Sequence, residues 1–549
     1  MADINWDGDY FDLPKEKFQQ MTVGQRLDHF AKRIVKHGME RPALIYRFHI
    51  KMLLLNYGGY CILVGLMPRP SAMPTYDYSV LLFAKLLVWQ HLAEAFGCRQ
   101  GPLSGMTFPT NWLYRLSRGT LKYSCLPQLG GNKRNVVDFA VHCLFFISGL
   151  AFLFCPWYSF VCIRALFFCD VYLFMFDRTQ FYASTAHAYG SMLLSACFPL
   201  DCGSFAGMQL GLIMQWFFSG IGKIGPWFQY VNGPFMLQSR WLRGSKWLLK
   251  LLVESEDKMT PTLFGTCLAH LAAFVEYFAP IALMVPSNAA IWLGLIGLTA
   301  MHVYILLTPA PFDVYSWNLC FCLSGIYLFY IGSFGFDFSS WTDMAFCLRL
   351  WLFAEFCLCW YGQFFPDQIG YYLSHRYWAG NWVQTHFMVR KNQTVKDKLD
   401  KVDPRLPNPL SLEPTPYYLM CLGYMPFAYT WLATMNMKCI VRLVEDVLNM
   451  GSRTTVDDWA FCGLQSWLCG EFRDQIYTHT MMPLIQEECK FDEGECYLIR
   501  LGAFRMFQHE ASWQIYDAKK GVVREGKLTT EMMSSIDSRP SASMELLMA

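Results

Sequence analysis

The sequence predicts an all-α membrane bundle of about ten transmembrane helices, followed by a small α+β C-terminal domain. Of the 549 residues, 54% are hydrophobic and only 16% are charged, whereas about 25% of the residues of an average soluble domain are charged. Long apolar stretches recur as far as residue 363, and basic residues gather in alternate connections between them. The 45 basic and 43 acidic residues nearly balance, so the net charge gives no indication of nucleic acid binding.

Residues 1–42 form a polar N-terminal segment. Four aspartates lie within its first twelve positions, and it has neither the apolar core of a cleavable signal nor the basic, acid-poor composition of a transit peptide. We therefore expect the first membrane helix to insert as an uncleaved anchor.

Residues 43–363 are predicted to form the multi-pass transmembrane domain. A helix needs about 20 mostly apolar residues to cross a bilayer. Ten stretches approach that length: 46–67, 78–97, 137–155, 158–176, 181–200, 204–222, 262–285, 288–308, 315–336 and 343–363.

The distribution of Lys and Arg predicts the orientation of these helices. Short loops rich in Lys and Arg stay on the cytoplasmic side of a membrane. The N-terminal segment and the loops 98–136 and 223–261 are basic, whereas the alternate short loops contribute only Arg69. Ten spans with both termini in the cytoplasm fit this asymmetry.

The composition changes after the transmembrane domain. Residues 364–416 are assigned to an amphipathic segment and a charged, proline-rich linker, and residues 417–528 to a small C-terminal domain. Residues 529–549 are rich in Ser and Met and are expected to be disordered. The apolar stretch 417–435 is either an eleventh span or the core helix of the small domain.

Alternating patterns predict β-strands near the end of that domain. Residues 497–504 fit one strand, and residues 512–517 and 521–526 fit a pair joined by a tight turn at 518–520. Residues 440–487 are read as helical.

Several ionisable side chains fall within the apolar stretches. Such residues are costly in a membrane, face the interior of the bundle and mark functional sites. His91 and Glu94 are three residues apart and share one helix face, while Glu276 follows His270 by nearly two turns. The set expected to line a functional cavity is His91, Glu94, His187, Lys223, His270 and Glu276.

The remaining ionisable groups have a structural interpretation. His142 and His302 are read as hydrogen-bonded core histidines, and Asp177 is assigned to a connecting loop. Two further pairs are interpreted as structural pairs or as contacts at the membrane boundary: Arg164 with Asp170 and Arg349 with Glu355.

Lys223 is the strongest catalytic candidate among these residues. A lysine kept from water can lose its proton and serve as a general base near physiological pH. It follows Gly220 and Gly222, which allow another helix to approach, and precedes Pro226, which can break a helix. The alternative is a lysine that only marks the start of a cytoplasmic loop.

No metal site is predicted. Membrane di-iron enzymes need several ligands that converge on each metal, in patterns such as HxxxH or ExxH. The sequence contains none of these patterns.

QWFFSGIGKIGPWF (215–228) resembles a segment of the vitamin K-dependent gamma-carboxylase-like group, also called the horizontally transferred transmembrane (HTTM) domain. NGPFMLQSRWL (232–242), AHAYG (186–190) and the stretch 270–280 extend this resemblance. It implies an HTTM-type bundle, with Lys223 as the base that deprotonates a reduced quinone and His187 near it. The cofactor it suggests is thus a quinone or lipid. The carboxylase has a large luminal β-rich domain, which this chain lacks, so protein carboxylation is not expected.

The chain is also similar, over nearly its whole length, to a family of polytopic membrane proteins without assigned function. The segments that carry this similarity are 101–122, 316–321, 366–382 and 488–504. This resemblance implies no particular reaction.

Three functional hypotheses remain open from the sequence. The first is a membrane-embedded catalyst acting on a lipid or quinone. The second is a non-catalytic protein for lipid handling, transport or maturation, and the third is an accessory subunit of a membrane protein complex. All three place the chain in a lipid bilayer as a multi-pass protein.

Overall fold

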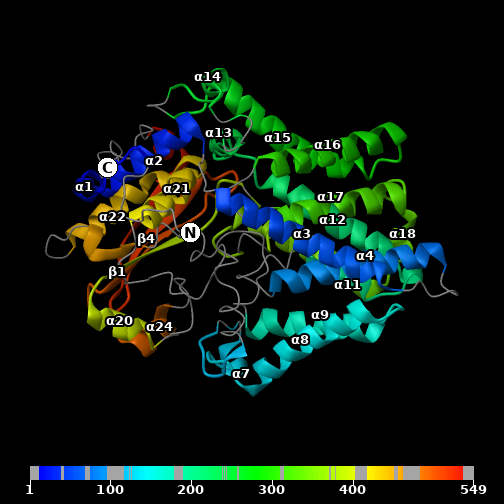
Figure 1. Cartoon of the computed structure of the whole chain (residues 1–549). Helices are drawn as coiled ribbons and strands as arrows, with labels where there is room; N and C mark the ends of the chain where they lie inside the picture. Colours follow the sequence, from blue (N-terminus) through cyan, green and yellow to red (C-terminus); the bar gives the residue numbers. More distant parts are fainter. Residues whose placement is uncertain are drawn as a thin grey trace.

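Apolar helices packed side by side form one part of the molecule, and a five-stranded sheet covered by helices forms the other (Figure 1). The computed structural model describes residues 11–535, apart from 39–42, 68–73, 96–115, 123, 125, 178–188, 238, 240–241, 243, 256–258, 309–314, 370–372, 378, 402–416, 451–455 and 462–481.

The bundle contains helices at positions close to the predicted apolar stretches, and one more, at residues 229–237, within the stretch 223–261 that was predicted as a loop. They are α3 (Ala43–Gly65), α4 (Thr75–Ala95), α8 (Val136–Phe154), α9 (Phe160–Phe176), α11 (Gly190–Ala196), α12 (Ser204–Ile221), α13 (Gln229–Leu237), α15 (Leu263–Ala282), α16 (Asn288–Leu307), α17 (Tyr315–Ile326) with its π-helical extension η3 (Tyr327–Ile331), and α19 (Phe346–Phe364). Short helices α7 (Pro127–Gly130), α14 (Lys246–Leu252) and α18 (Ser339–Asp343) connect them.

The predicted count of ten spans is not confirmed. Among the described residues, three helices are long and apolar enough to cross a membrane, namely α8, α15 and α16. The stretch 181–200 contains only the seven-residue α11 within its described part. The coarser prediction, a mostly helical protein with membrane-type helices and a small C-terminal sheet, is confirmed.

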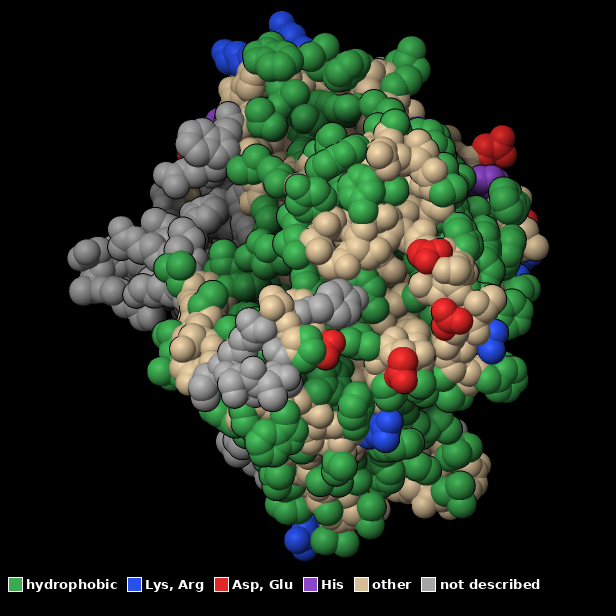
Figure 2. Space-filling view, turned by 90° about the vertical axis from the view of Figure 1, so that its right-hand side faces the viewer, with side chains coloured by type: hydrophobic (Ala, Val, Ile, Leu, Met, Phe, Trp, Pro, Cys, Tyr) green, Lys and Arg blue, Asp and Glu red, His purple; other side chains and the backbone are tan. Residues whose placement is uncertain are grey.

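The surface of the bundle is apolar over much of its area. Large hydrophobic side chains are exposed on α8, α15, α16 and α19, including Phe154, Leu263, Ile296 and Phe346. Figure 2 shows the end of the molecule that lies at the right of Figure 1, where hydrophobic side chains predominate and charged groups are scattered. Such a surface suits contact with lipid rather than water.

The C-terminal part is built on one antiparallel sheet with the strand order β2-β1-β3-β4-β5. Its strands are β1 (Gln384–Arg390), β2 (Trp459–Phe461), β3 (Cys496–Leu501), β4 (Glu510–Asp517) and β5 (Gly521–Thr529). The three strands expected from the sequence correspond to β3, β4 and β5. Gly521 has a φ of 86° at the turn between β4 and β5, a conformation that favours glycine.

Two strands occur where none was expected. β1 lies in the predicted amphipathic segment, before the charged linker, and it pairs with β3 from Gln384 opposite Leu501 to Val389 opposite Cys496. β2 lies in the region read as helical. Helices α20 (Gln393–Leu399), α22 (Ile440–Asn449), α24 (Met482–Cys489) and α25 (Thr530–Ser535) complete this part.

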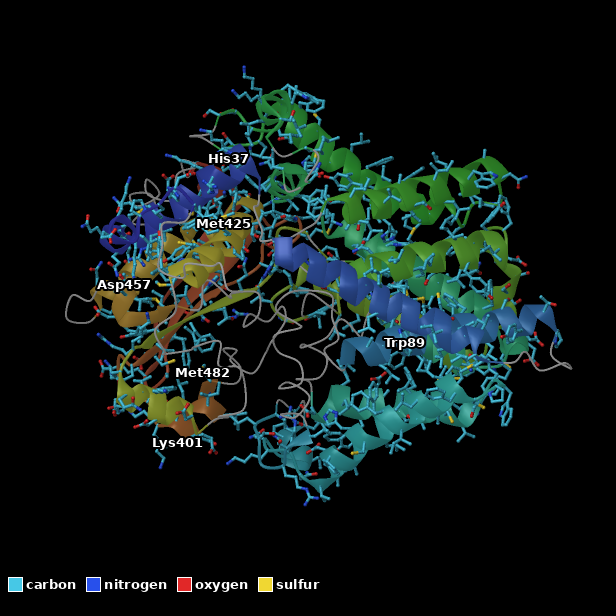
Figure 3. All side chains as sticks on the ribbon, viewed as in Figure 1. His37, Trp89, Lys401, Met425, Asp457 and Met482 are labelled. Carbon is cyan, nitrogen blue, oxygen red and sulfur yellow. The ribbon has the colours of Figure 1, made fainter. Side chains whose placement is uncertain are left out.

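Helix α21 (Tyr417–Ala433) is the core helix of the C-terminal part and is not one of the three membrane-type helices. It packs against α13 and against α2 (Val23–His37), which follows α1 (Lys15–Gln20). Side chains fill the space between α2, α21 and the sheet, where Figure 3 labels Met425 of α21. Arg26 Nη1 of α2 donates to Asp457 Oδ1 at 2.9 Å and so joins the N-terminal helices to the residues that precede β2.

Candidate functional site

Lys223 lies in the turn that follows α12 and faces α15. Its Nζ donates to Glu276 Oε2, and the two side chains are only 7% and 11% exposed. The Lys223 ammonium also lies 5.6 Å from the centre of the Phe228 ring. The sequence predicted both residues as members of one site, and the structure brings them into direct contact.

A glycine allows α12 and α15 to approach this closely. A Cβ atom added at Gly220 would lie 2.5 Å from the backbone nitrogen of Tyr277, the residue after Glu276. Any larger side chain would push the two helices apart and separate Lys223 from Glu276.

The ion pair borders a cavity of about 100 Å³, here called the Lys223 cavity. Helices α12, α13, α15, α16 and α17 form its walls together with Tyr377, which follows α19. The lining residues are Gln215, Trp216, Ser219, Lys223, Phe228, Val231, Asn232, Phe235, Ala272, Glu276, Met301, His302, Tyr304, Ile305, Trp317, Asn318, Phe321 and Tyr377.

One face of α12 presents polar groups to the cavity. Gln215 and Ser219 are four residues apart and lie on one side of α12, and Lys223, in the turn that follows, continues this interval of four. The side chains of Gln215 and Ser219 are buried, and neither has a hydrogen-bond partner among the described residues. They are therefore free to bind a ligand.

Trp317 of α17 provides another unused group in the cavity wall. Its side chain is buried, and the indole Nε1 has no hydrogen-bond partner among the described residues. The indole ring lies 4.8 Å from the ring of Tyr377. Because indole N–H can only donate, Trp317 would favour a ligand that carries an acceptor.

His302 of α16 is fixed in the cavity wall by two hydrogen bonds. Trp216 Nε1 donates to His302 Nε2 at 2.9 Å, and His302 Nδ1 lies 2.9 Å from Asn318 Oδ1. Since indole N–H is only a donor, Nε2 must accept, and the ring proton of the neutral histidine is on Nδ1. His302 is hydrogen-bonded, as the sequence predicted, but it also lines the site.

These groups define what the Lys223 cavity can bind. The charge of Lys223 is compensated by Glu276, so the cavity offers no net positive charge to an anion. Its walls are mainly apolar and aromatic, with hydrogen-bonding groups from Gln215, Ser219 and Trp317 that lack partners among the described residues. Small-molecule sites typically combine apolar walls with a few polar groups that fix orientation.

The other predicted site residues lie elsewhere. His270 is on the exposed side of α15 and is not among the residues that line the Lys223 cavity, to which this helix contributes Ala272 and Glu276. His91 is buried in α4, where its Nε2 lies 2.6 Å from Asp170 Oδ2 of α9. Glu94 belongs to α4, but its side chain is outside the described part, as is the whole of His187.

The expected pairing of other charged residues is wrong in two places. Asp170 contacts His91, and Arg164 Nε instead donates to the carbonyl oxygen of Cys197 at 3.0 Å. Glu355 accepts from Ser191 and lies 3.4 Å from His375 Nε2 rather than pairing with Arg349. In both cases the partner belongs to another element, which spacing within one helix cannot indicate.

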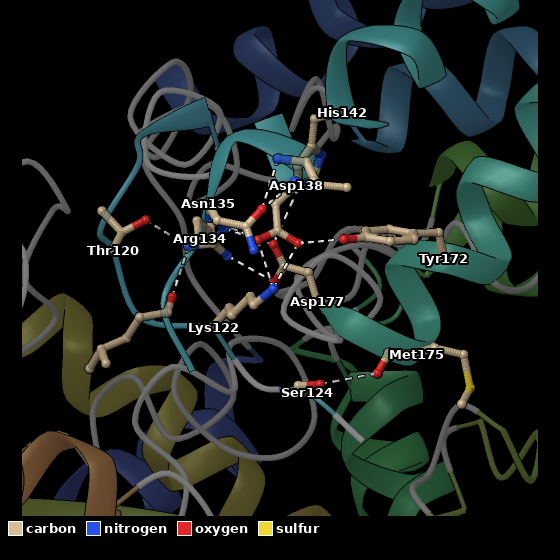
Figure 4. Close-up of polar contacts among 12 residues, drawn as sticks. Thr120, Lys122, Ser124, Arg134, Asn135, Asp138, His142, Tyr172, Met175 and Asp177 are labelled. Atoms are coloured by element: carbon tan, nitrogen blue, oxygen red, sulfur yellow. Dashed lines mark hydrogen bonds and ion pairs between the residues drawn. The ribbon is translucent and has the colours of Figure 1, made fainter. Parts of the chain in front are cut away.

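Asp177, assigned to a loop from the sequence, is completely buried at the end of α9 (Figure 4). Arg134 donates to both of its carboxylate oxygens, at 2.7 and 3.0 Å, and His142 Nε2 lies 3.3 Å away. Beside them Lys122 donates to both oxygens of Asp138 at 2.7 Å. These hydrogen bonds connect the segment before α8 with the end of α9, and they give the cluster a structural role.

No group of three or more His, Cys, Asp or Glu residues in the described part of the chain could hold a metal ion.

Comparison with known families places the chain beside membrane proteins without assigned function. The family model described as a transmembrane protein of unknown function (DUF3556) matches residues 7–543. This agrees with the expected similarity to a polytopic family that covers nearly the whole chain, whereas the resemblance to gamma-carboxylase or HTTM proteins finds no support. No curated protein and no solved structure matches the chain.

Proposed function

The chain belongs to the DUF3556 family of transmembrane proteins of unknown function, and from this premise we propose that its helix bundle binds an uncharged lipid-soluble ligand in the Lys223 cavity. We further propose that Lys223 acts on this ligand as a general base. A lipid or a quinone is the ligand class suggested by the sequence.

One observation carries this proposal: a buried ion pair borders a cavity that contains unused hydrogen-bonding groups. A buried ion pair loses the hydration of both charges and adds little to stability compared with well-packed apolar residues. A purely structural pair would also need no cavity beside it. The free groups of Ser219 and Trp317 support binding, since buried polar groups normally have partners.

Proton transfer within the ion pair can convert Lys223 into a base. Transfer of one proton from Lys223 Nζ to Glu276 leaves a neutral amine beside a neutral carboxylic acid. The amine then takes a proton from an acidic O–H or C–H of the ligand, so that Lys223 is again an ammonium and the ligand an anion. Trp317 would stabilise the negative charge by donating a hydrogen bond. For His187 we propose, as the resemblance implied, that it polarises the ligand or relays a proton.

The same pair also favours a non-catalytic alternative. The Lys223 ammonium is already paired with the Glu276 carboxylate and is not free to act as a base. A cavity beside such a neutralised pair can bind a neutral lipid without changing it chemically. In that case the protein would handle, transport or help to mature a lipid or a partner, or serve as an accessory subunit of a complex. Bound ligand without turnover would favour this alternative.

We also propose that the bundle crosses the membrane about ten times with both termini in the cytoplasm. The basic loops on one side of the apolar stretches support this orientation. Reporter fusions at each terminus, one active only in the cytoplasm and the other only outside it, test the proposal. An external terminus would contradict it.

The ligand proposal is tested by purifying the protein in mild detergent and identifying co-purified small molecules by mass spectrometry. We expect one lipid-soluble compound in the unaltered protein and its loss from Trp317→Phe, which removes the free donor but keeps an aromatic ring. Trp292→Phe is the matched control, since Trp292 is exposed on the apolar surface of α16. The same compounds in all three proteins would contradict binding in this cavity.

A further inference from the structure

A short helix with an unusual surface lies at the start of the membrane-type helix α15. Leu248 and Leu252 of α14 are buried and pack with Leu237 in a small apolar cluster. The opposite side is exposed and carries two pairs at a spacing of four residues. Trp247 and Leu251 form the apolar pair, 65% and 37% exposed, and Lys246 and Lys250 form the basic pair.

The backbone holds α14 at the end of α15 (Figure 1). A β-bridge joins Val253 to Pro261, and the N–H of Thr262 donates to the carbonyl oxygen of Leu252 at 3.1 Å. A Cβ atom added at Gly265, in the first turn of α15, would lie 2.7 Å from that same oxygen. The position of α14 is therefore fixed at the level where α15 begins.

The exposed apolar surface continues from α14 onto α15. The first two residues of α15, Leu263 and Phe264, are 82% and 51% exposed. Because α15 is long and apolar enough to cross a membrane, its first turn is expected to lie near the boundary between the acyl chains and the headgroups.

We propose that α14 lies on the surface of the bilayer and binds anionic phospholipids. Trp247 and Leu251 insert at the boundary between headgroups and acyl chains, and Lys246 and Lys250 contact lipid phosphates. Tryptophan is enriched at membrane interfaces, and helices with one apolar and one basic face lie in the plane of the interface. A lipid surface fits better than a protein partner because this apolar surface is continuous with that of a membrane-type helix.

The charge component is tested by native mass spectrometry of the full chain with mixed phosphatidylglycerol and phosphatidylcholine. Each lysine near an anionic surface favours binding by about fivefold, so the double variant Lys246→Gln/Lys250→Gln should lose at least about fivefold of its preference for phosphatidylglycerol. Lys519→Gln/Lys520→Gln is the control, because it removes the same charge at the turn between β4 and β5. An equal loss in both double variants, or no loss in either, would overturn the proposal.

The position of α14 is tested separately with a fluorinated phenylalanine at residue 247 in the full chain, reconstituted in nanodiscs. We expect doxyl-labelled lipid to broaden its ¹⁹F resonance and a water-soluble gadolinium chelate to leave it nearly unchanged. The same label at Val522, which is exposed on β5, should respond in the opposite way. Broadening of the residue 247 signal by the chelate alone would show that α14 lies in water and would overturn the proposal.

Discussion

Lys223 and Glu276 form a buried ion pair between α12 and α15, 53 positions apart in the chain. The pair faces a cavity whose walls combine aromatic rings with polar groups that have no partner among the described residues. This relationship is the basis of the proposed function, and its energetics can be measured independently of any reaction.

The first prediction concerns the coupling between these two residues. Removal of one partner leaves an uncompensated buried charge, which costs about 3–5 kcal/mol. We expect Lys223→Met and Glu276→Leu each to lower the free energy of unfolding in detergent by about this amount. The double variant should be more stable than the sum of the two losses implies. Additive losses in this double-mutant cycle would show that the residues do not interact.

The second prediction concerns the hydrogen bond that Trp216 donates to His302. Trp216→Phe removes the donor to His302 Nε2 and leaves a buried acceptor unsatisfied, which costs about 1–3 kcal/mol. The expected result is a lower thermal unfolding temperature. Trp292→Phe changes an exposed tryptophan in the same way and should leave that temperature nearly unchanged. Equal effects of the two substitutions would contradict the role given to Trp216.

The third prediction concerns Lys438, which lies in η4 (Met435–Cys439) outside the membrane-type helices. Its Nζ lies 3.7 Å from the centre of the Trp431 ring and 5.2 Å from that of Tyr230. Burial lowers the pKa of Lys438 from 10.5 to about 7. The unfolded chain therefore binds one more proton than the folded protein between these pH values.

The stability of the unaltered protein should consequently rise with pH across this interval, with a contribution from Lys438 of up to roughly 1.4 kcal/mol per pH unit. Lys438→Met should remove that contribution and raise the stability at pH 7. Unfolding of both proteins at several pH values between 7 and 10 measures the difference. Parallel pH profiles would contradict the buried, uncompensated state of Lys438.

The fourth prediction concerns Asp177 in the cluster of Figure 4. Burial acts to raise the pKa of this carboxyl, but the charge of Arg134 and the hydrogen bond with His142 hold it well below its ordinary value. The stability that Asp177 provides is thus present at neutral pH and is lost only as the pH falls below about 4.

Asp177→Asn removes the negative charge beside Arg134 and should lower the free energy of unfolding at pH 7 by about 3–5 kcal/mol. Asp201→Asn is a suitable control, since it removes the same charge from an exposed position. If both variants unfold at the same temperature as the unaltered protein, the cluster does not stabilise the fold.

Much of the fold could be predicted because apolar length and alternation are local properties. The helices α8, α15 and α16 and the strands β4 and β5 lie within a few residues of their expected positions. The strand β1 could not be recognised in this way. It lies next to a charged, proline-rich stretch, and it is a strand because it pairs with β2 and β3, which both come much later in the chain.

The candidate site was predictable only in part, for a related reason. Lys223 and Glu276 were identified because charge is rare in apolar helices, but charge alone does not tell which residues meet. His270 carries the same signal on the exposed side of its helix. Ser219 and Trp317 are uncharged and gave no signal, although the spacing of Gln215, Ser219 and Lys223 by four residues could have revealed the polar face of α12.

The measurement that tests the central claim most directly is an electron cryomicroscopy structure of the protein purified from native membranes without added ligand. The account predicts density for one small molecule in the Lys223 cavity, within hydrogen-bond distance of Trp317 Nε1 and close to Lys223 Nζ. A cavity closed by its own side chains, with Trp317 bonded to another part of the chain, would contradict the claim that this site binds a ligand.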